Sequence, residues 1–280
     1  MTVLLEPLRH AWRTPRGRAG ALVLLVIATV VIFSPPFLPD PLAQPDPIGG
    51  ASLAPSITHP FGTDQLSRDV LSRVAVGGRV SLVVAVIAVG LSLTLGALVG
   101  LVAGYWGGVV DAALMRVVDA ALAVPRLFLL LLVLAMSERV PVWALVLLIG
   151  ATGWFGTSRI VRAEVLRLRE ESYVRASEAL GASPRRVIFR HLLPNTLGPL
   201  LVAATLGVGD VILLEAGLSF LGLGIQPPAP SWGGMILDAR EVLVTAPWAG
   251  LFPGVAIVLT VLSANLIGDA VRDAVDPRGA

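Results

Sequence analysis

The stretch VSLVVAVIAVGLSLTLGALVGLVAG, residues 80–104, runs for 25 residues without a charged side chain. A helix needs about 20 apolar residues to cross ~30 Å of hydrocarbon, so this stretch is long enough to span a bilayer. Of the 280 residues in the chain, 55% are hydrophobic and 14% are charged. A soluble domain carries roughly a quarter charged residues. The sequence therefore predicts a membrane protein.

Six apolar stretches approach the length of a transmembrane helix, so we expect an all-α polytopic membrane protein. They cover residues 19–38, 80–104, 112–136, 142–155, 197–220 and 249–271. The fourth stretch is short, and residues 156–160 would extend it. The first resembles a signal peptide with a cleavage site near Ala43, but its long apolar run favours an uncleaved anchor. We divide the chain into residues 1–79, which include the first span, and a core of five spans at residues 80–280.

The arginines are distributed unequally between the two sides that six spans would define. Lysine is absent, so all 21 basic residues are arginines. Fourteen lie before the first span, between the fourth and fifth, or after the sixth, at positions 9, 13, 16, 18, 159, 162, 167, 169, 175, 185, 186, 190, 272 and 278. Five lie on the opposite side, at positions 68, 73, 79, 139 and 240. Because basic loops stay in the cytoplasm, both termini are predicted to be cytoplasmic.

The segment between the first two spans is predicted to lie outside the cell. Eight prolines between Pro35 and Pro60 oppose regular structure and favour a stiff, extended path. Apolar residues then recur at helical spacing over residues 63–76, and Thr63 is a suitable N-cap. We expect this second part to be a short helix along the outer membrane surface.

Motifs for catalysis or cofactor binding are absent from the sequence. There is no cysteine, so disulfides and thiolate sites are excluded. A P-loop requires a lysine, which the chain lacks, so it cannot hold ATP in that way. His10, His59 and His191 fall in different parts of the predicted topology, which argues against a metal site. The net charge of +2 and the clustering of arginines beside apolar segments argue against nucleic-acid binding. We expect no enzyme, no cofactor and no metal.

The longest predicted cytoplasmic loop, residues 157–196, contains the stretch ESYVRASEALGASPRRVIFRHLLPN at residues 171–195. Its first half has helical spacing over residues 171–180, and Gly181 follows where helices commonly end in a left-handed residue. Ser183 and Pro184 suit the N-cap and first position of a second helix over residues 184–191. The stretch predicts a helix, a glycine turn and a second helix.

Three interpretations of this element are open. It is a solvated basic loop, a DNA-reading helix-turn-helix, or a docking helix that fits a groove on a partner protein. Attachment to membrane spans at both ends argues against DNA. We favour docking, because any ATP that drives this chain must be hydrolysed by a partner.

The runs ASEALG at residues 176–181 and HLLPN at residues 191–195 resemble the EAA loop of ATP-binding-cassette (ABC) importer permeases. More narrowly, the chain is similar to the second (C-type) permease subunit of dipeptide, oligopeptide and nickel importers. That similarity also rests on FGTDQLSRD at residues 61–69 and SFLGLGIQPPAPSWGGM at residues 219–235, and it covers nearly the whole chain. The resemblance implies a type I ABC importer permease fold in a bacterial cell membrane.

The resemblance also implies that the helix before Gly181 docks on an ATPase. The residues of this ATPase-coupling loop are Tyr173, Arg175, Ala176, Ser177, Leu180, Gly181, Pro184 and Pro194. The implied partners are a second homologous permease, two cytoplasmic ABC ATPases and an extracytoplasmic solute-binding protein. Three residues depart from the family pattern: Arg175 and Ser177 in the loop, and Ser67 where the family usually has glycine.

Three ionisable residues, Arg126, Asp210 and Glu215, fall inside predicted spans, where such groups tend to face a cavity or one another. Comparable depths would let Arg126 pair with either acid. These residues are candidates for a translocation path that meets a zwitterionic or cationic solute. The alternative is an ion pair that fixes helix packing, or side chains that extend to the outer surface. Residues 222–241 either stiffen the outer surface, with Trp232 among lipid headgroups, or contact the binding protein.

The sequence thus favours the permease subunit of an ABC importer for peptides or a related small solute, with a nickel chelate as one option. The alternative is a secondary transporter or channel, which would need inverted repeats or ion sites on broken helices. A membrane-bound enzyme ranks third, because no catalytic constellation is present.

Overall fold

A computed structural model describes residues 9, 11–137 and 140–275, and within these residues the regular structure is helical. Its longer helices are α2 (Pro15–Phe33), α3 (Val70–Trp106), α4 (Gly108–Leu122), α5 (Arg126–Ala135), α6 (Val142–Arg169), α9 (Leu193–Phe220) and α11 (Trp248–Val275). Its short elements are η1 (Pro35–Phe37), α7 (Ser172–Ala179), α8 (Pro184–Val187), the π-helix η2 (Ile188–Leu192), α10 (Trp232–Ala239) and η3 (Arg240–Val242). Arg139 and Arg278, counted above for orientation, lie outside the described residues.

Within the described residues, five helices are long and apolar enough to cross a membrane, and there are six such spans if α4 and α5 count as one. The pair α4 and α5 is bent by 75°, so the apolar stretch predicted at residues 112–136 forms two helices instead of one straight helix. Pro125 lies at the bend, where it lacks an N–H and clashes with the preceding turn. The predicted fourth and fifth spans are parts of longer helices, since α6 reaches Arg169 and a helical run covers Pro184–Phe220.

Helix α3 is longer than predicted, and this overturns the predicted surface helix at residues 63–76. Residues 70–76 are the first turns of α3. Asp69 is the N-cap, because its carboxylate accepts from the backbone N–H of Ser72. Thr63 instead forms an isolated bridge with Asp69, and its hydroxyl donates to the carbonyl of Gly50. The preceding segment, residues 34–69, contains only one short 3₁₀ turn at Pro35–Phe37.

Close packing of α3 on α6 forms the centre of the bundle. Gly96, Gly100 and Gly104 recur every four residues on α3, and a Cβ on Gly100 would lie 2.6 Å from the carbonyl oxygen of Ser158. The backbones of α3 and α6 therefore approach closely, as small residues at this spacing allow. Ion pairs from Arg159 to Asp119 and from Arg162 to Asp111 join α6 to α4.

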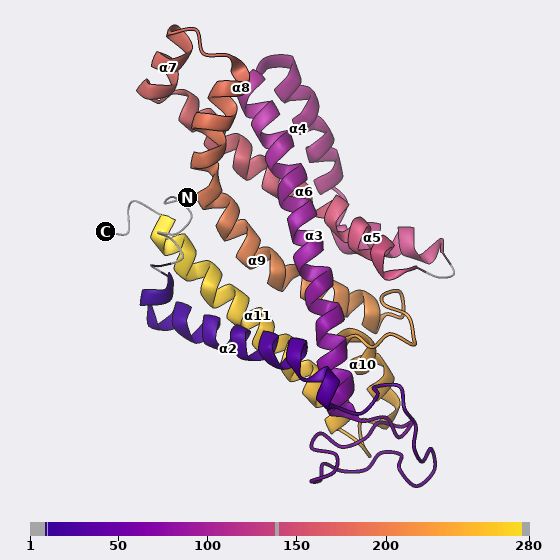
Figure 1. Ribbon diagram of the computed structural model, residues 1–280. Helices are drawn as coiled ribbons and strands as arrows, with labels where there is room; N and C mark the ends of the chain where they lie inside the picture. The colour runs from indigo at the N-terminus through magenta and orange to yellow at the C-terminus, as the bar shows by residue number, and fades with distance from the viewer. Residues whose placement is uncertain (1–8, 10, 138–139, 276–280) are drawn as a thin grey trace.

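The bundle has two distinct ends (Figure 1). Helices α7 and α8 lie at one end, which we call the α7 end. Helix α10 and the segment before α3 lie at the other, which we call the α10 end. Helix α9 runs from α8 toward α10 and so connects the two ends, while α2 packs beside α11.

Candidate functional site

The α7 end carries a helix, a glycine turn and a second helix, which confirms that prediction. Helix α7 ends at Ala179 with Leu180 as its C-cap, and Gly181 follows with φ of +80°, in the left-handed region. The N–H of Gly181 donates to the carbonyl of Glu178 at 2.9 Å, and that of Ala182 to Ser177 at 3.1 Å. These bonds satisfy carbonyls at the helix end, as a left-handed glycine commonly does. No atom lies within 4 Å of a Cβ built on Gly181, so backbone conformation alone favours glycine here.

One side of α7 is anchored and the other is free. Val174 is fully buried and packs with Val165, Leu168, Val187 and Leu192. Most other residues of the predicted coupling loop are exposed, including Tyr173 at 42% and Leu180 at 89%. Burial and the nearby Glu171 carboxylate raise the pKa of Tyr173 above its usual range. The exposed side of α7 thus offers apolar and neutral groups flanked by arginines.

The π-helix η2 connects α8 to α9, and no pattern in the sequence predicts it. His191 lies in η2, with its Nε2 atom 3.3 Å from the hydroxyl of Ser177 and its ring 5.9 Å from that of Tyr173. Pro194 lacks a backbone N–H, and the side-chain amide of Asn195 donates to the carbonyl of His191 at 2.6 Å. Helix α7 therefore rests on the first turns of the helical run that becomes α9.

A cavity of about 290 Å³ lies between α3, α5, α6 and α9. Its polar lining comes from Ser92, Arg126, Thr157 and Asp210, and its other lining residues are apolar or glycine. A second cavity of about 200 Å³ shares Arg126. We call the first one the central cavity.

Arg126 is the first residue of α5 and is held from one side. Its Nε donates to the hydroxyl of Thr152 at 3.2 Å and its Nη2 to the carbonyl of Ile149. Its Nη1 makes no hydrogen bond to any part of the chain that the structure describes. Gly153 gives the guanidinium room, because a Cβ there would lie 3.0 Å from Nη2 and 2.1 Å from the hydroxyl of Ser92.

The two acidic candidates on α9 occupy different environments. Asp210 is exposed and lines the central cavity with Arg126, but no ion pair within 4.0 Å joins them among the described residues. Glu215 is fully buried, and its carboxylate accepts from Ser81 at 3.0 Å and from Ser219 at 2.7 Å. Among the described residues, Arg126 therefore forms no direct ion pair with either acid, although the sequence makes such a pair possible. Serine hydroxyls donate to Glu215, and Asp210 lines the same cavity as the arginine without direct contact.

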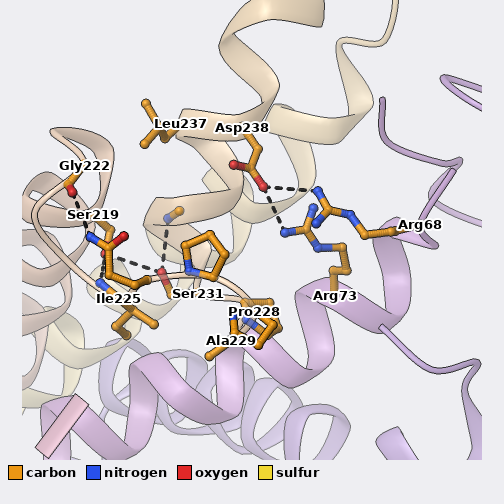
Figure 2. A pocket seen from close by; sticks show the side chains of 14 residues that line it. Arg68, Arg73, Ser219, Gly222, Ile225, Pro228, Ala229, Ser231, Leu237 and Asp238 are labelled. Atoms are coloured by element: carbon orange, nitrogen blue, oxygen red, sulfur yellow. Dashed lines mark hydrogen bonds and ion pairs between the residues drawn. The ribbon is translucent and has the colours of Figure 1, made fainter. Parts of the chain in front are cut away.

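Four charged residues that we did not predict as a group converge at the α10 end, and Figure 2 shows three of them, Arg68, Arg73 and Asp238. Asp64 pairs with Arg68 at 2.7 Å and also with Arg73. Asp238, from α10, pairs with Arg68 at 3.3 Å and with Arg73 at 3.0 Å. We call these four residues the outer cluster. They lie beside a pocket of about 70 Å³ that the loop before α10 also lines.

Further contacts fasten the motif at residues 61–69 to the last two helices. Phe61 stacks on Phe252 with ring centroids 3.9 Å apart, and Trp248 donates to the carbonyl of Thr63 at 3.0 Å. Ser67 has φ of +64°, which explains physically why glycine suits this position. Trp232 is 1% exposed and its indole donates to the carbonyl of Val74 at 2.9 Å, so of the two alternatives for this loop the one that places Trp232 among headgroups does not hold.

Comparison with known proteins identifies a matching family, several relatives and a solved structure with a similar fold. Residues 96–279 match the family described as binding-protein-dependent transport system inner membrane component. A protein of Brucella suis biovar 1 (strain 1330), provisionally named a peptide permease, is 46% identical over 96% of this chain and 90% of its own length. The dipeptide transport system permease protein DppC of Alkalihalophilus pseudofirmus is 41% identical over 98% of this chain and 90% of its own length.

Among solved structures, an inward-facing conformation of the MetNI methionine ABC transporter has a similar fold. It matches with a TM-score of 0.56 and 18% identity, over 71% of this chain and 94% of that one. At this identity the likeness concerns the fold alone.

Proposed function

Because the chain belongs to the family of binding-protein-dependent transport system inner membrane components, we propose that it is the permease subunit of an ABC importer for peptides. It is a multi-pass protein of the bacterial plasma membrane, and its family implies ATPase subunits and another permease as partners. The names of its relatives, which describe peptide and dipeptide transport, support peptides as the solute. One structural observation carries the proposal: the exposed α7 and its glycine turn, which rest on the helix that reaches the central cavity.

The proposed orientation places the α7 end in the cytoplasm and the α10 end outside. Many arginines lie at or near the α7 end, at positions 167, 169, 175, 185, 186 and 190. Such clusters remain on the cytoplasmic side during insertion. The α10 end then faces an external solute-binding protein, and the α7 end faces two ATPases.

In this arrangement α7 is the element that docks on an ATPase. Val174 fixes its inner side, while Tyr173, Ala176 and Leu180 offer a small apolar surface to a groove on the partner. Movement of α7 reaches η2 through the contacts of Ser177 and Tyr173 with His191. Because η2 continues into α9, that movement also reaches Asp210. ATPase closure would thus reshape the central cavity.

The central cavity is the proposed part of the translocation path, with Arg126 and Asp210 on its wall. Glu215 has a different place in this proposal. It lies behind the wall, where the hydrogen bond that it accepts from Ser81 fixes α9 against α3, while the one from Ser219 stays within α9.

Replacing Gly181 by valine tests the coupling role. A β-branched residue at a φ of +80° is strained by about 1–2 kcal/mol, so the turn changes shape while the transmembrane helices remain intact. We expect ATP-driven peptide uptake by the reconstituted complex to fall about tenfold or more, with residual ATP hydrolysis. Gly181→Asn is the matched control, because asparagine tolerates left-handed backbone and should retain most uptake. Normal uptake by Gly181→Val would contradict the coupling role.

A second measurement separates an ABC importer from a secondary transporter. Peptide-loaded binding protein should stimulate ATP hydrolysis by the purified complex. A secondary transporter would show no such stimulation, and its uptake would follow an ion gradient instead.

A further inference from the structure

We propose that the central cavity binds both ends of a peptide in transit, with Arg126 taking the carboxylate and Asp210 the ammonium group. This inference rests on the proposed function, and it adds a specific recognition site within the permease itself. It predicts that the permease recognises the charged termini common to peptides and is indifferent to their side chains.

The arginine is oriented for a ligand. Hydrogen bonds from Nε and Nη2 to Thr152 and Ile149 hold the guanidinium on one side. Nη1 is left with two N–H groups that have no partner among the residues described. Arg126 also lines both neighbouring cavities, so its head group is accessible from each. A planar guanidinium with free N–H groups is well suited to a carboxylate.

Asp210 supplies the opposite charge in the central cavity. Asp210 lies on an otherwise apolar stretch of α9, yet its side chain is exposed and lines the central cavity. A carboxylate among apolar helices is costly unless it meets water, a counter-ion or a ligand. Since no ion pair binds it within the described residues, an ammonium group entering the cavity would meet an available carboxylate.

The rest of the lining suits a permissive site. Gly153, Gly156 and Gly207 line the central cavity, and a Cβ on Gly156 would meet no atom within 4 Å. The volume of about 290 Å³ is at the low end for ligand pockets, which typically have 300–1,000 Å³. With two charged contacts and a lining that is otherwise mostly apolar, binding is weak. Weak binding suits a path, because a solute must leave it as readily as it enters.

The chain has no cysteine, which permits a direct binding test that does not depend on delivery by a binding protein. We would introduce Thr157→Cys, a substitution by a residue of similar size on the cavity wall, into the intact complex and measure its labelling by a maleimide. The probes are trialanine, N-acetyl-trialanine and trialanine amide at 10 mM. If the site binds trialanine with a Kd of about 5 mM, labelling should slow about threefold.

The two blocked peptides show which residue binds which end of the peptide. With Arg126 and Asp210 both present, each blocked peptide should slow the labelling of Thr157→Cys less than trialanine does, because each lacks one terminal charge. Arg126→Gln should abolish the difference between trialanine and its amide, while Asp210→Asn should abolish the difference between trialanine and its N-acetyl form. Asp269→Asn, on exposed α11 surface, is the matched control and should leave the full pattern. Gly254→Cys, also on α11 and in open surroundings, controls for labelling and should not respond to peptide.

The inference is overturned if labelling of Thr157→Cys ignores all three probes or if all three protect equally. ATP hydrolysis stimulated by peptide-loaded binding protein is measured on the same preparation. If ATP hydrolysis is stimulated but no peptide protects Thr157→Cys from labelling, the binding site in the central cavity is rejected and the importer function is retained. If ATP hydrolysis is not stimulated, the importer function itself is rejected.

Discussion

The outer cluster and the central cavity both hold charges of opposite sign, but they hold them differently. In the outer cluster each carboxylate contacts two guanidinium groups, and Asp64 and Arg73 are almost completely buried. In the central cavity Arg126 and Asp210 line one wall without contact, and Asp210 is exposed. Paired charges are neutralised within the chain and serve its architecture, whereas separated charges retain capacity for a ligand. Substitutions in the two regions should therefore affect different properties.

The largest loss of stability should follow Asp64→Ala in the outer cluster. Asp64 pairs with Arg68 and Arg73 and also accepts from the backbone N–H groups of Leu66 and Arg68 at 2.9 Å. Removing one partner of a buried ion pair costs about 3–5 kcal/mol, because the remaining charges are left unbalanced. Thermal unfolding of the complex in detergent would measure this loss. Asp40→Ala, at an exposed loop position, is the control and should change little. An unchanged melting temperature for Asp64→Ala would mean that the cluster does not hold the α10 end together.

A smaller loss should follow Glu215→Leu, which lies between the two regions. The change leaves the hydroxyls of Ser81 and Ser219 without their buried acceptor, at a cost of about 1–3 kcal/mol. Glu215→Gln keeps the shape and an oxygen acceptor, so it should restore most of the stability. The same unfolding measurement compares the two variants. Equal loss in both would show that the negative charge of Glu215, and not its hydrogen bonds, is what matters.

The smallest change in stability should follow Arg126→Met in the central cavity. Its two acceptors keep other contacts, because the hydroxyl of Thr152 still donates to the carbonyls of Leu148 and Ile149. We expect a change within about 0.5 kcal/mol, together with impaired peptide uptake. The matched comparison is Arg73→Met in the outer cluster, which should lower the stability of the complex far more than Arg126→Met does. If both variants unfold at the same lowered temperature, the distinction between the two regions fails.

The sequence predicted most of the helices because long apolar runs and a glycine turn are local signals. The bend between α4 and α5 had a local signal as well, in Pro125, but hydropathy alone joined the two helices. The start of α3 was missed because Arg73 and Arg79 interrupt the apolar run, and Arg73 is neutralised by partners far away in the chain. Asp238 lies 165 residues from Arg73, and no periodicity links positions so distant. The buried place of Trp232 depends on α3 in the same way.

The π-helix η2 sets the rotational phase between α7 and α9. A π-helix accommodates one residue more than an α-helix over the same path, and one residue corresponds to about 100° of rotation about the helix axis. Deleting one residue of Ile188–Leu192 would let this segment close as an α-helix and would preserve the orientation of α9 relative to α7. The same deletion within α9 ahead of Asp210 would instead turn Asp210 by about 100° and off the cavity lining, although every residue of both sites would still be present. The alignment of α7 with the central cavity thus depends on the number of residues between them as well as on which residues they are.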